Sequence, residues 1–585
     1  MDSGELILAA ATGDLAHPPG FPAYVLLGRL FSWLPIGSPA FRLSLMSAFF
    51  GAVTLGLLAL LLAALARRVG HRGTSLDGFL FATSALLPLL SESFVAYATV
   101  AEVYTFNTAL FVGALVLLAE RMSTFGVRVL GLVVGLGLAG HHASWVLWGP
   151  ALALFYLVGR RADGPLSSRS WTEMPRRLRE LLPALPWTVL GLATYLYLPV
   201  AARAAWLGWG DVTSWQRFWW HVSAGQYRAY WSQMTFERWT AGLVGLGELL
   251  GTHFTIFGAV VAMVGLVLWW RLDRAVWMLL VTGTVCTVAY VAAYDIAEDG
   301  DAYLLPIFLL YVVAWTAIPL TARQILPSRK AGAVSTATVL ALWTALASQM
   351  PAGSGVHRLF TLQGRADEGL ARVYVEDLVA DVAPGGLVLT KDWQFHAPFL
   401  YLQRLQGFRS DLTVINLNLL RYSWYLKHLD RATPPAMQAC AAERRAYETL
   451  LRAWENNAAV PPEDLTRTYN ALVEALIRRH LDHQKEVHPG LPIEDGIGAA
   501  YTWQPRALTF QLLRQPTKRP LKTSTPRWQH LQNPDLRPPA STKVRSVYTF
   551  MLRTRGDFLR QAGFHEEAGE ALKAASELDV VVSGG

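Results

Sequence analysis

Long apolar runs constrain this 585-residue chain more than any other feature of its sequence. Residues 43–66 (LSLMSAFFGAVTLGLLALLLAALA) contain no charged side chain. The runs 253–270, 275–294 and 303–320 have about the length that a helix needs to cross the hydrocarbon layer of a bilayer. Only 16% of the residues are charged, whereas soluble domains average about 25%. These runs therefore predict a polytopic α-helical membrane protein.

The hydropathy pattern predicts about ten transmembrane helices followed by a soluble domain. The hydrophobic segments are 43–66, 78–95, 103–120, 127–140, 143–158, 184–201, 253–270, 275–294, 303–320 and 332–350. His141 and His142 separate two short segments, which are either tilted spans or a broken pair. We expect a membrane domain over 1–350 and a soluble domain over 351–585.

Basic side chains lie in every second loop between these segments. Because cytoplasmic loops carry an excess of Lys and Arg, the alternation predicts that these loops are cytoplasmic. The predicted outer face then takes the other connections, which are 1–42, 96–102, 141–142, 202–252, 295–302 and the C-terminal domain. The net charge of +8 is thus a topology signal and not the mark of a nucleic-acid partner. This topology, without an organelle signal, fits a bacterial inner membrane with a periplasmic C-terminal domain.

Two carboxylates, Asp2 and Glu5, stand at the start of this apolar chain. At i, i+3 they share one face of a helix, and the same spacing is also that of a helix N-terminal capping box. A Pro/Gly run, 17–22 (HPPGFP), follows and predicts a non-helical turn near the same surface. We therefore predict a catalytic base in this pair. No hydrophobic segment precedes Asp2, so we also expect a first helix that this sequence lacks.

Further polar residues on the predicted outer face are candidates for binding a substrate. The acids and histidines suit sugar hydroxyls, and the arginines suit a phosphate. The candidates are His17, Arg29, Arg42, Glu102, Tyr104, Asn107, His141, His142, Arg203, Asp211, His221, Glu298 and Asp301. Each also has a structural alternative: Glu102 as a helix cap, the arginines as snorkelling side chains, and the acidic loop 294–303 as a solvated loop.

A tryptophan-rich outer loop, 202–252, contains an aromatic stripe at helical spacing. Trp215, Phe218, Trp219 and Val222 follow i, i+3, i+4, i+7. Such a helix either lies in the membrane interface as an aromatic anchor or guides a lipid substrate.

The soluble domain has a βαβ-like pattern at its start. The expected elements are a helix at 368–383, a strand at 385–390, a helix at 394–406, a strand at 412–417, and helices at 440–456 and 463–485. Residues 505–543 are predicted to form an irregular loop, and 545–578 resemble one tetratricopeptide-like repeat.

Several segments, in order, resemble one large polytopic family. They are DSGELILAAATGDLAHPPGFPAYVLLGRL, AEVYTFN, YLYLPV, WGD, RFWWHVSAGQY, YDIAEDGDAYLLP and LVLTKDWQFHAPFLYLQRLQGFRSDLTVINLNLLRYSWYL. The resemblance covers about residues 1–430, and DSGEL and HPPG are its specific motifs. The family it resembles is that of the transmembrane protein O-mannosyltransferases, within the polyprenyl-phosphate-sugar-dependent glycosyltransferases of the GT-C superfamily.

The resemblance implies a GT-C-like fold whose catalytic acid lies in the first outer loop, with Asp2 as the base and Glu5 as its neighbour. The implied reaction moves a sugar, mannose being suggested, from a polyprenyl phosphate to a hydroxyl of a protein or glycan, with inversion. We expect no cofactor, since no G-x-x-x-x-G-K-[ST] motif is present, and no metal; Cys286 and Cys440 are too isolated for a metal site. The alternatives are a transporter or flippase for a lipid-linked or polar solute, and an inactive envelope scaffold.

Overall fold

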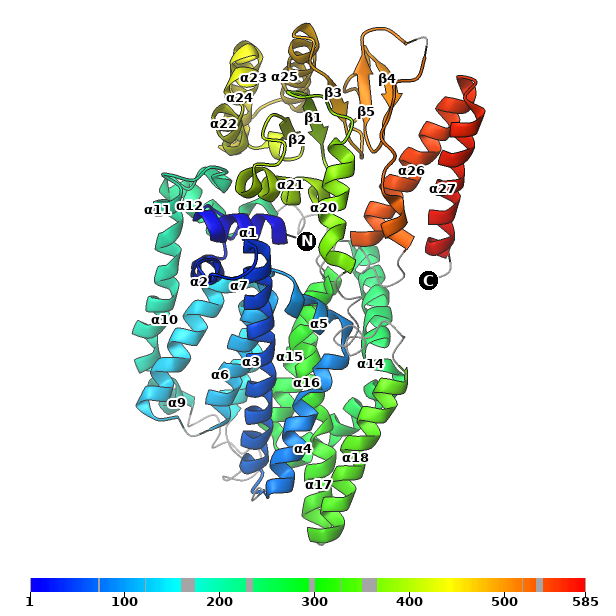
Figure 1. Ribbon diagram of the computed structural model, residues 1–585. Helices are drawn as coiled ribbons and strands as arrows, with labels where there is room; N and C mark the ends of the chain where they lie inside the picture. Colours follow the sequence, from blue (N-terminus) through cyan, green and yellow to red (C-terminus); the bar gives the residue numbers. More distant parts are fainter. Residues whose placement is uncertain are drawn as a thin grey trace. The chain divides into compact units, whose positions relative to one another are not determined.

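The chain folds into two compact units (Figure 1). Unit 1 comprises Met1–Leu8, Ala202–Ser214 and Gln363–Gly585, and unit 2 comprises Ala9–Ala201 and Trp215–Leu362. The computed structural model describes residues 2–71, 74–120, 122–158, 174–227, 235–293, 300–326, 328–349, 366–517, 519–532 and 540–583. The expected boundary near residue 350 assigned only the C-terminal chain to the second domain, whereas unit 1 also takes in the first residues and the WGD segment.

Unit 2 is helical throughout the residues that the structure describes. The N-terminal helix α1 (Ser3–Thr12) begins in unit 1 and ends in unit 2. The other elements are α2 (Pro22–Ser32), α3 (Pro39–Arg68), α4 (Ser75–Ala85), η1 (Leu87–Leu90), α5 (Glu92–Thr99), α6 (Tyr104–Ala119), α7 (Thr124–Val158), α9 (Met174–Glu180), η3 (Leu182–Ala184), α10 (Leu185–Leu192), η4 (Ala193–Leu196), α11 (Tyr197–Ala201), α12 (Trp215–Val222), η6 (Gly225–Tyr227), α14 (Phe236–Leu272), α15 (Arg274–Ala293), η7 (Gly300–Leu304), α16 (Leu305–Trp315), α17 (Ala317–Ile325) and α18 (Ser328–Gln349).

The described helices make the chain a multi-pass membrane protein. Five of them are long and apolar enough to cross a bilayer, namely Pro39–Arg68, Thr124–Val158, Met174–Ala201, Arg274–Ala293 and Gly300–Ile325. The count rises to six if Ser75–Leu90 and Glu92–Thr99, which are bent by 82°, form one broken span. The polytopic prediction is confirmed, while the number of about ten spans stays a prediction.

The histidine pair interrupts one long helix. The predicted segments 127–140 and 143–158 both belong to α7, and His141 has non-helical backbone angles (φ −161°, ψ 82°). The broken-pair alternative is therefore the one observed. N-terminal to the break, Gly131 allows close packing, because a Cβ there would lie only 2.2 Å from the carbonyl oxygen of Ala184.

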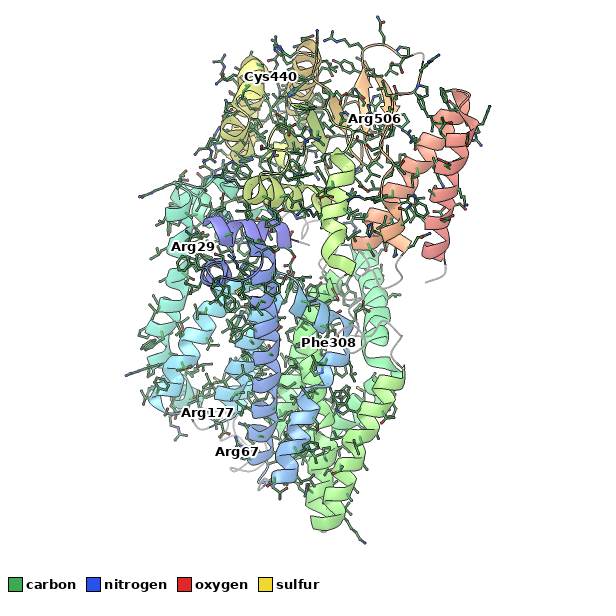
Figure 2. All side chains as sticks on the ribbon, in the orientation of Figure 1. Arg29, Arg67, Arg177, Phe308, Cys440 and Arg506 are labelled. Carbon is green, nitrogen blue, oxygen red and sulfur yellow. The ribbon has the colours of Figure 1, made fainter. Side chains whose placement is uncertain are left out.

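The basic ends of several helices meet at one end of unit 2. Arg68, in the last turn of α3, donates a 2.9 Å hydrogen bond to Asp273 between α14 and α15, and both side chains are buried, at 4% and 1% exposed. The Arg68 guanidinium also lies 4.9 Å from the ring centre of Phe155 near the end of α7. Figure 2 labels Arg67 and Arg177 at this end. Described basic residues from several of the alternate loops thus lie at one end of unit 2, in agreement with the positive-inside pattern.

Unit 1 is built around a small parallel sheet of order β2-β1-β3. Its central strand β1 (Leu387–Thr390) pairs with β2 (Thr413–Asn416) and with β3 (Val487–Pro489). Helix α21 (Trp393–Gln406) connects β1 to β2, so the predicted βαβ unit is confirmed. All four residues of β1 are buried, which agrees with the apolar Leu387, Val388 and Leu389 that begin it.

Helices and a hairpin surround this sheet (Figure 1). The remaining elements of unit 1 are η5 (Trp209–Asp211), α20 (Ala366–Val379), η9 (Leu419–Arg421), α22 (Ser423–Ala432), α23 (Pro434–Ala439), α24 (Ala441–Glu455), α25 (Pro462–Asp482), β4 (Thr502–Pro505), β5 (Phe510–Leu513), η10 (Trp528–Gln532), α26 (Ala540–Gln561) and α27 (His565–Ser583). The prediction of an irregular loop from 505 onward is wrong for β5, which pairs with β4. Helices α26 and α27 form the expected hairpin; its tetratricopeptide character stays a prediction.

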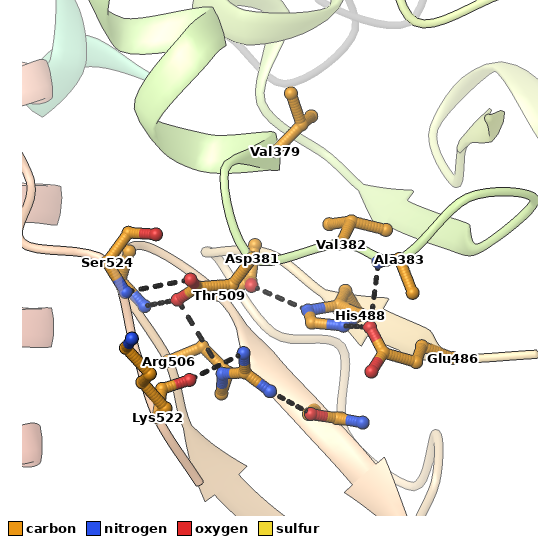
Figure 3. Close-up of polar contacts among 12 residues, drawn as sticks. Val379, Asp381, Val382, Ala383, Glu486, His488, Arg506, Thr509, Lys522 and Ser524 are labelled. Atoms are coloured by element: carbon orange, nitrogen blue, oxygen red, sulfur yellow. Dashed lines mark hydrogen bonds and ion pairs between the residues drawn. The ribbon is translucent and has the colours of Figure 1, made fainter. Parts of the chain in front are cut away.

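A buried polar network ties β3 to the β4–β5 hairpin (Figure 3). His488 on β3 contacts the Thr509 hydroxyl at 2.9 Å through Nδ1 and the Glu486 carboxylate at 3.1 Å through Nε2. Asp381 accepts hydrogen bonds from the backbone N–H of Ala507 (3.0 Å) and of Ser524 (2.8 Å). Burial lowers the pKa of His488. Because these polar groups are paired, the network fixes the hairpin and leaves few of its buried atoms unsatisfied.

Candidate active site

The candidate base lies at the start of α1, within unit 1. The indole Nε1 of Trp393 donates a 2.7 Å hydrogen bond to Oδ1 of Asp2. Glu5, in the first turn of α1, is 1% exposed. Gly4 permits this arrangement, because a Cβ there would lie 2.6 Å from the carbonyl oxygen of Ala397 on α21. The glycine of the DSGEL motif is thus explained by the close approach of two helices.

Trp393 is held firmly at the carboxyl end of the central strand. It is the first residue of α21, and its predecessor Asp392 caps that helix by accepting the Gln394 N–H at 3.0 Å. Asp392 also accepts a 2.6 Å hydrogen bond from the Tyr374 hydroxyl. On one side, the ring of Trp209 meets the Trp393 ring edge to face, with centroids 6.1 Å apart. In parallel α/β sheets, ligands bind at this edge.

The WGD segment is anchored to the C-terminal part of unit 1. Asp211 forms a 2.6 Å ion pair with Lys427. The next residue of α22, His428, contacts the carbonyl oxygen of Trp206 at 2.9 Å, and Arg431 donates to the carbonyl oxygen of Ala205 at 2.7 Å. Asp211 therefore has a partner that fixes the loop. Arg203, on the same segment, is exposed.

The HPPG motif forms a tight turn in unit 2. Gly20 has φ +90°, a left-handed conformation that favours glycine. A Cβ at Gly20 would also lie 2.9 Å from Nε2 of His221 on α12. His17 meets Phe21 edge to face, with ring centroids 5.0 Å apart. Burial, and then the proximity of His17, lower the pKa of His221 to about 3, so this imidazole is neutral at physiological pH.

Aromatic rings surround the break in α7. The ring of His141 stacks on Phe21 at 5.7 Å and lies within 5.6 Å of Tyr104 and 5.3 Å of Tyr303. The Ser144 hydroxyl is 2.8 Å from Nδ1 of His141. We call His141, Phe21, Tyr104 and Tyr303 the aromatic cluster. At the kink, the imidazole of His141 contacts three aromatic rings from distant parts of the chain.

Asp301 lies beside this cluster, on η7. It accepts a 2.7 Å hydrogen bond from the Tyr97 hydroxyl and a short one from Ser93. The Tyr97 ring contacts that of Tyr104 at 5.1 Å. Asp301 thus lies beside the aromatic cluster. The sequence alone left open whether its loop is solvated or functional. Glu298 lies outside the described residues.

The other candidates in unit 2 have definable surroundings. Glu102 is 4% exposed, and its N–H donates to the Ser47 hydroxyl at 3.4 Å. The N-cap of α6 is Val103, so Glu102 lies one residue before the cap, and its role at the start of this helix stays a prediction. Asn107 donates to the Val103 carbonyl oxygen (3.0 Å) and accepts from the Trp145 indole (3.2 Å), which accounts for its amide structurally.

The two candidate arginines of unit 2 differ. Arg42 donates to three backbone carbonyl oxygens, those of Ser32, Ile36 and Gly37, and so closes the turn between α2 and α3. Nη1 of Arg29 is buried and has no hydrogen-bond partner among the described residues. The same is true of Nδ1 of His142. Arg29 is therefore better suited than Arg42 to meet an anion.

Several residues of these clusters were not among the sequence candidates. Trp393, Phe21 and Tyr303 all lie in segments whose family resemblance was noticed, but isolated aromatic residues look like core or interface residues in a membrane protein. Only the fold shows what they contact.

The predicted helix at 215–222 is confirmed as α12, with Trp215 71% exposed and Trp219 51% exposed; its place in the membrane interface stays a prediction.

The fold and the two sets of residues define a multi-pass membrane protein with a carboxylate pair at the start of α1, a kinked helix that carries an aromatic cluster, and an α/β unit. Residues 2–164 match the family described as the Protein O-mannosyl-transferase TMEM260 N-terminal domain. The chain is 25% identical over 457 residues to Protein O-mannosyl-transferase TMEM260 of Mus musculus, an alignment that covers 74% of this chain and 61% of the relative. The predicted resemblance to an O-mannosyltransferase-like protein is confirmed.

The match with the curated relative is incomplete in length, since the chain spans about 61% of it. Among solved structures, the crystal structure of ArnT from Cupriavidus metallidurans bound to undecaprenyl phosphate matches with a TM-score of 0.45 and 11% identity. That match covers 88% of this chain and 93% of the ArnT chain.

Proposed function

We propose that this chain is a membrane glycosyltransferase that moves a sugar from a polyprenyl-phosphate carrier to an acceptor hydroxyl. The observation that carries the proposal is the match of residues 2–164 to the N-terminal domain of a protein named as an O-mannosyl-transferase. This stretch contains Asp2, Glu5, the turn at His17, and His141. Mannose is the first candidate for the sugar, and a protein or a glycan is the acceptor.

The proposed reaction is a single displacement at the anomeric carbon. The acceptor oxygen attacks this carbon and the Asp2 carboxylate takes the hydroxyl proton, while Glu5 keeps the local charge negative. The bond between the anomeric carbon and the phosphate oxygen breaks, and the lipid phosphate leaves with both electrons of that bond. Without a covalent intermediate the anomeric configuration inverts.

The leaving phosphate needs positive charge or N–H donors. We assign this role first to Arg29, whose buried Nη1 has no partner among the described residues, and second to Arg203, which is exposed. Gly13 (φ +76°) leaves room for the Arg29 guanidinium, since a Cβ there would lie 2.5 Å from Nη1. Arg42 is a weaker candidate because its donors reach backbone carbonyls.

The aromatic cluster suits a sugar ring. A pyranose has apolar C–H faces and hydroxyl edges, and sites that combine aromatic rings with a few fixed polar groups recognise such ligands. Tyr104, His141 and Tyr303 supply the rings, and Asp301 supplies a carboxylate held by two hydroxyls. We assign donor-sugar binding to this cluster, with His17, His142, Glu102 and His221 as further polar groups of unit 2.

The proposed topology follows the basic loops. The end of unit 2 that carries Arg67, Arg68 and Arg177 is cytoplasmic, and the opposite end, which bears the aromatic cluster, faces outward. Unit 1 then lies on the periplasmic side of a bacterial inner membrane. Residues 1–350 supply the transmembrane domain, and 351–585 supply the soluble domain with its tetratricopeptide-like hairpin.

The purified full-length chain, tested with undecaprenyl-phosphate-linked mannose and a Ser/Thr-rich peptide, provides the direct test. We expect mannosylated peptide and free undecaprenyl phosphate in equal amounts, with inverted anomeric configuration by NMR. Undecaprenyl-phosphate-linked glucose tests the sugar, and GDP-mannose tests the carrier. Transfer from GDP-mannose alone, or movement of intact donor across vesicles without cleavage, would contradict the proposal and favour a nucleotide-dependent enzyme or a flippase.

A further inference from the structure

The C-terminal part of unit 1 contacts the N-terminal carboxylate pair through one side chain. Trp393 lies three residues after the end of β1 and donates its indole N–H to Oδ1 of Asp2 at 2.7 Å. Residues 2 and 393 are far apart in the sequence, and both lie in segments of the family resemblance, DSGEL and TKDWQF. Their contact gives a physical reason for the two segments to occur in one chain.

The indole is placed with little freedom. The first turn of α21 is fixed by the Asp392 cap and by the Tyr374 hydroxyl, which donates to Asp392 at 2.6 Å. The ring itself packs against Trp209, on the WGD segment, at 6.1 Å. That segment is in turn tied to α22 by the Asp211–Lys427 ion pair. A donor held in this way orients the carboxylate that accepts from it.

Helix α1 is also held in register with α21. The Gly4 Cα faces the carbonyl oxygen of Ala397, one turn after Trp393, with no room for a Cβ. Two contacts, one polar and one steric, thus fix the first turn of α1 against the start of α21. Without these contacts the carboxylate would sample many rotamers.

We propose that Trp393 is a positioning residue for catalysis: its indole N–H fixes the Asp2 carboxylate, so that the soluble C-terminal domain completes the active site. This inference rests on the proposed function, in which Asp2 is the base. It assigns the C-terminal domain a part in the reaction, beyond acceptor binding or scaffolding. The indole acts on Asp2 alone and needs no contact with the sugar.

The chain offers a matched pair of tryptophans for the test. Trp393→Phe removes the N–H and keeps an aromatic ring. Trp424→Phe makes the same change at a buried tryptophan whose ring centroid lies 4.4 Å from that of Trp209 and whose Nε1 has no hydrogen-bond partner among the described residues. Both variants are made in the full-length chain and assayed with undecaprenyl-phosphate-linked mannose and the Ser/Thr-rich peptide.

We expect Trp393→Phe to lower kcat by about tenfold or more, the effect of losing a hydrogen bond to a charged group, with KM for the lipid donor unchanged. A carboxylate that loses a donor to its charged form is protonated at higher pH, so the acidic limb of the pH–rate profile should also move upward. Trp424→Phe should keep the wild-type kcat and profile. If both variants behave alike while Asp2→Asn is inactive, the positioning role is refuted and the proposed function stands.

A second measurement needs no turnover. A double-mutant cycle on the thermal unfolding midpoint compares Asp2→Ala, which removes the acceptor oxygen, with Trp393→Phe and the double variant. We expect the double variant to lose less than the sum of the single losses, because both remove the same hydrogen bond, whereas Asp2→Ala and Trp424→Phe should be additive. Additivity in both cycles would refute the Trp393–Asp2 contact. Activity retained in Asp2→Asn would instead refute the proposed base.

Discussion

Gly4→Ala offers the sharpest test of how α1 is seated against α21. The added Cβ would lie 2.6 Å from the carbonyl oxygen and 2.7 Å from the carbonyl carbon of Ala397, and 2.9 Å from the nitrogen of Pro398. All three are backbone atoms, so no side chain can rotate away. Ordinary contact needs about 3.4 Å or more, which requires a displacement of about 0.8 Å between the two helices.

The same displacement reaches the candidate base. Added to the 2.7 Å distance between Trp393 Nε1 and Asp2 Oδ1, a shift of about 0.8 Å gives about 3.5 Å, beyond the usual range of such hydrogen bonds. Overpacking costs about 1–3 kcal/mol, and the better helix propensity of alanine returns up to about 1 kcal/mol. We therefore expect a lower unfolding midpoint and a kcat reduced by about tenfold or more.

Gly369→Ala is the matched control for this substitution. Gly369 also lies in a helix of unit 1, α20, and a Cβ there would meet nothing within 4 Å. This variant should unfold at the wild-type temperature or slightly above it, with unchanged kcat. Unfolding by differential scanning fluorimetry and initial rates of mannosyl transfer measure both effects. If Gly4→Ala matches Gly369→Ala in both assays, the close helix contact and its role in the site are refuted.

Three further predictions concern other parts of the chain. Asp273→Asn should destabilise the protein by about 3–5 kcal/mol, because it removes the negative charge from a buried ion pair with Arg68. Glu120→Gln, which breaks the exposed Arg67–Glu120 pair, should cost under about 1 kcal/mol; equal unfolding midpoints would contradict this. Burial, and then the proximity of His428, lower the pKa of His396 to about 3, so the imidazole is protonated in the unfolded chain but not in the folded one as the pH falls below about 6.5, and stability present above that pH is lost below it. His396→Leu should remove about 1.4 kcal/mol of the stability loss between about pH 7.5 and about pH 5.5. An unchanged pH dependence of stability in this variant would argue against a buried neutral imidazole. Asp301→Asn should raise KM for the donor several-fold more than it lowers kcat, as expected of a sugar-binding carboxylate; a pure kcat effect would remove Asp301 from donor binding.

Much of the fold could be predicted from local pattern. The apolar run at 43–66 lies in α3, and the aromatic stripe lies in α12. The βαβ unit could be predicted from two apolar strands on either side of a helical segment. The β5 strand was missed because Phe510–Leu513 lies among Pro, Lys and Arg residues, which look irregular until the hairpin partner is known. The kink at His141 was one of two alternatives, and hydropathy alone could not choose between them.

The candidate site was predictable only in part, for a physical reason. Carboxylates such as Asp2 attract notice because charge near an apolar chain is costly. Trp393 attracts none, since an indole serves equally well in a core, an interface or a site. Its role depends on one hydrogen bond to a residue at the other end of the sequence. Asp211 was selected for its charge, and the structure gives it Lys427 as a partner within the loop that supports Trp393.

The most direct test of the account is the rate of lipid-phosphate release by Asp2→Asn. The substitution keeps the size of the side chain and an oxygen for the Trp393 indole, but removes the base. Asp557→Asn, at an exposed ion pair with Arg560 in α26, is the matched control. We predict that Asp2→Asn releases undecaprenyl phosphate from its mannosyl form at least about 100-fold more slowly than the wild type, with an unchanged unfolding midpoint, while Asp557→Asn releases it at the wild-type rate. Wild-type release by a folded Asp2→Asn variant would contradict the account.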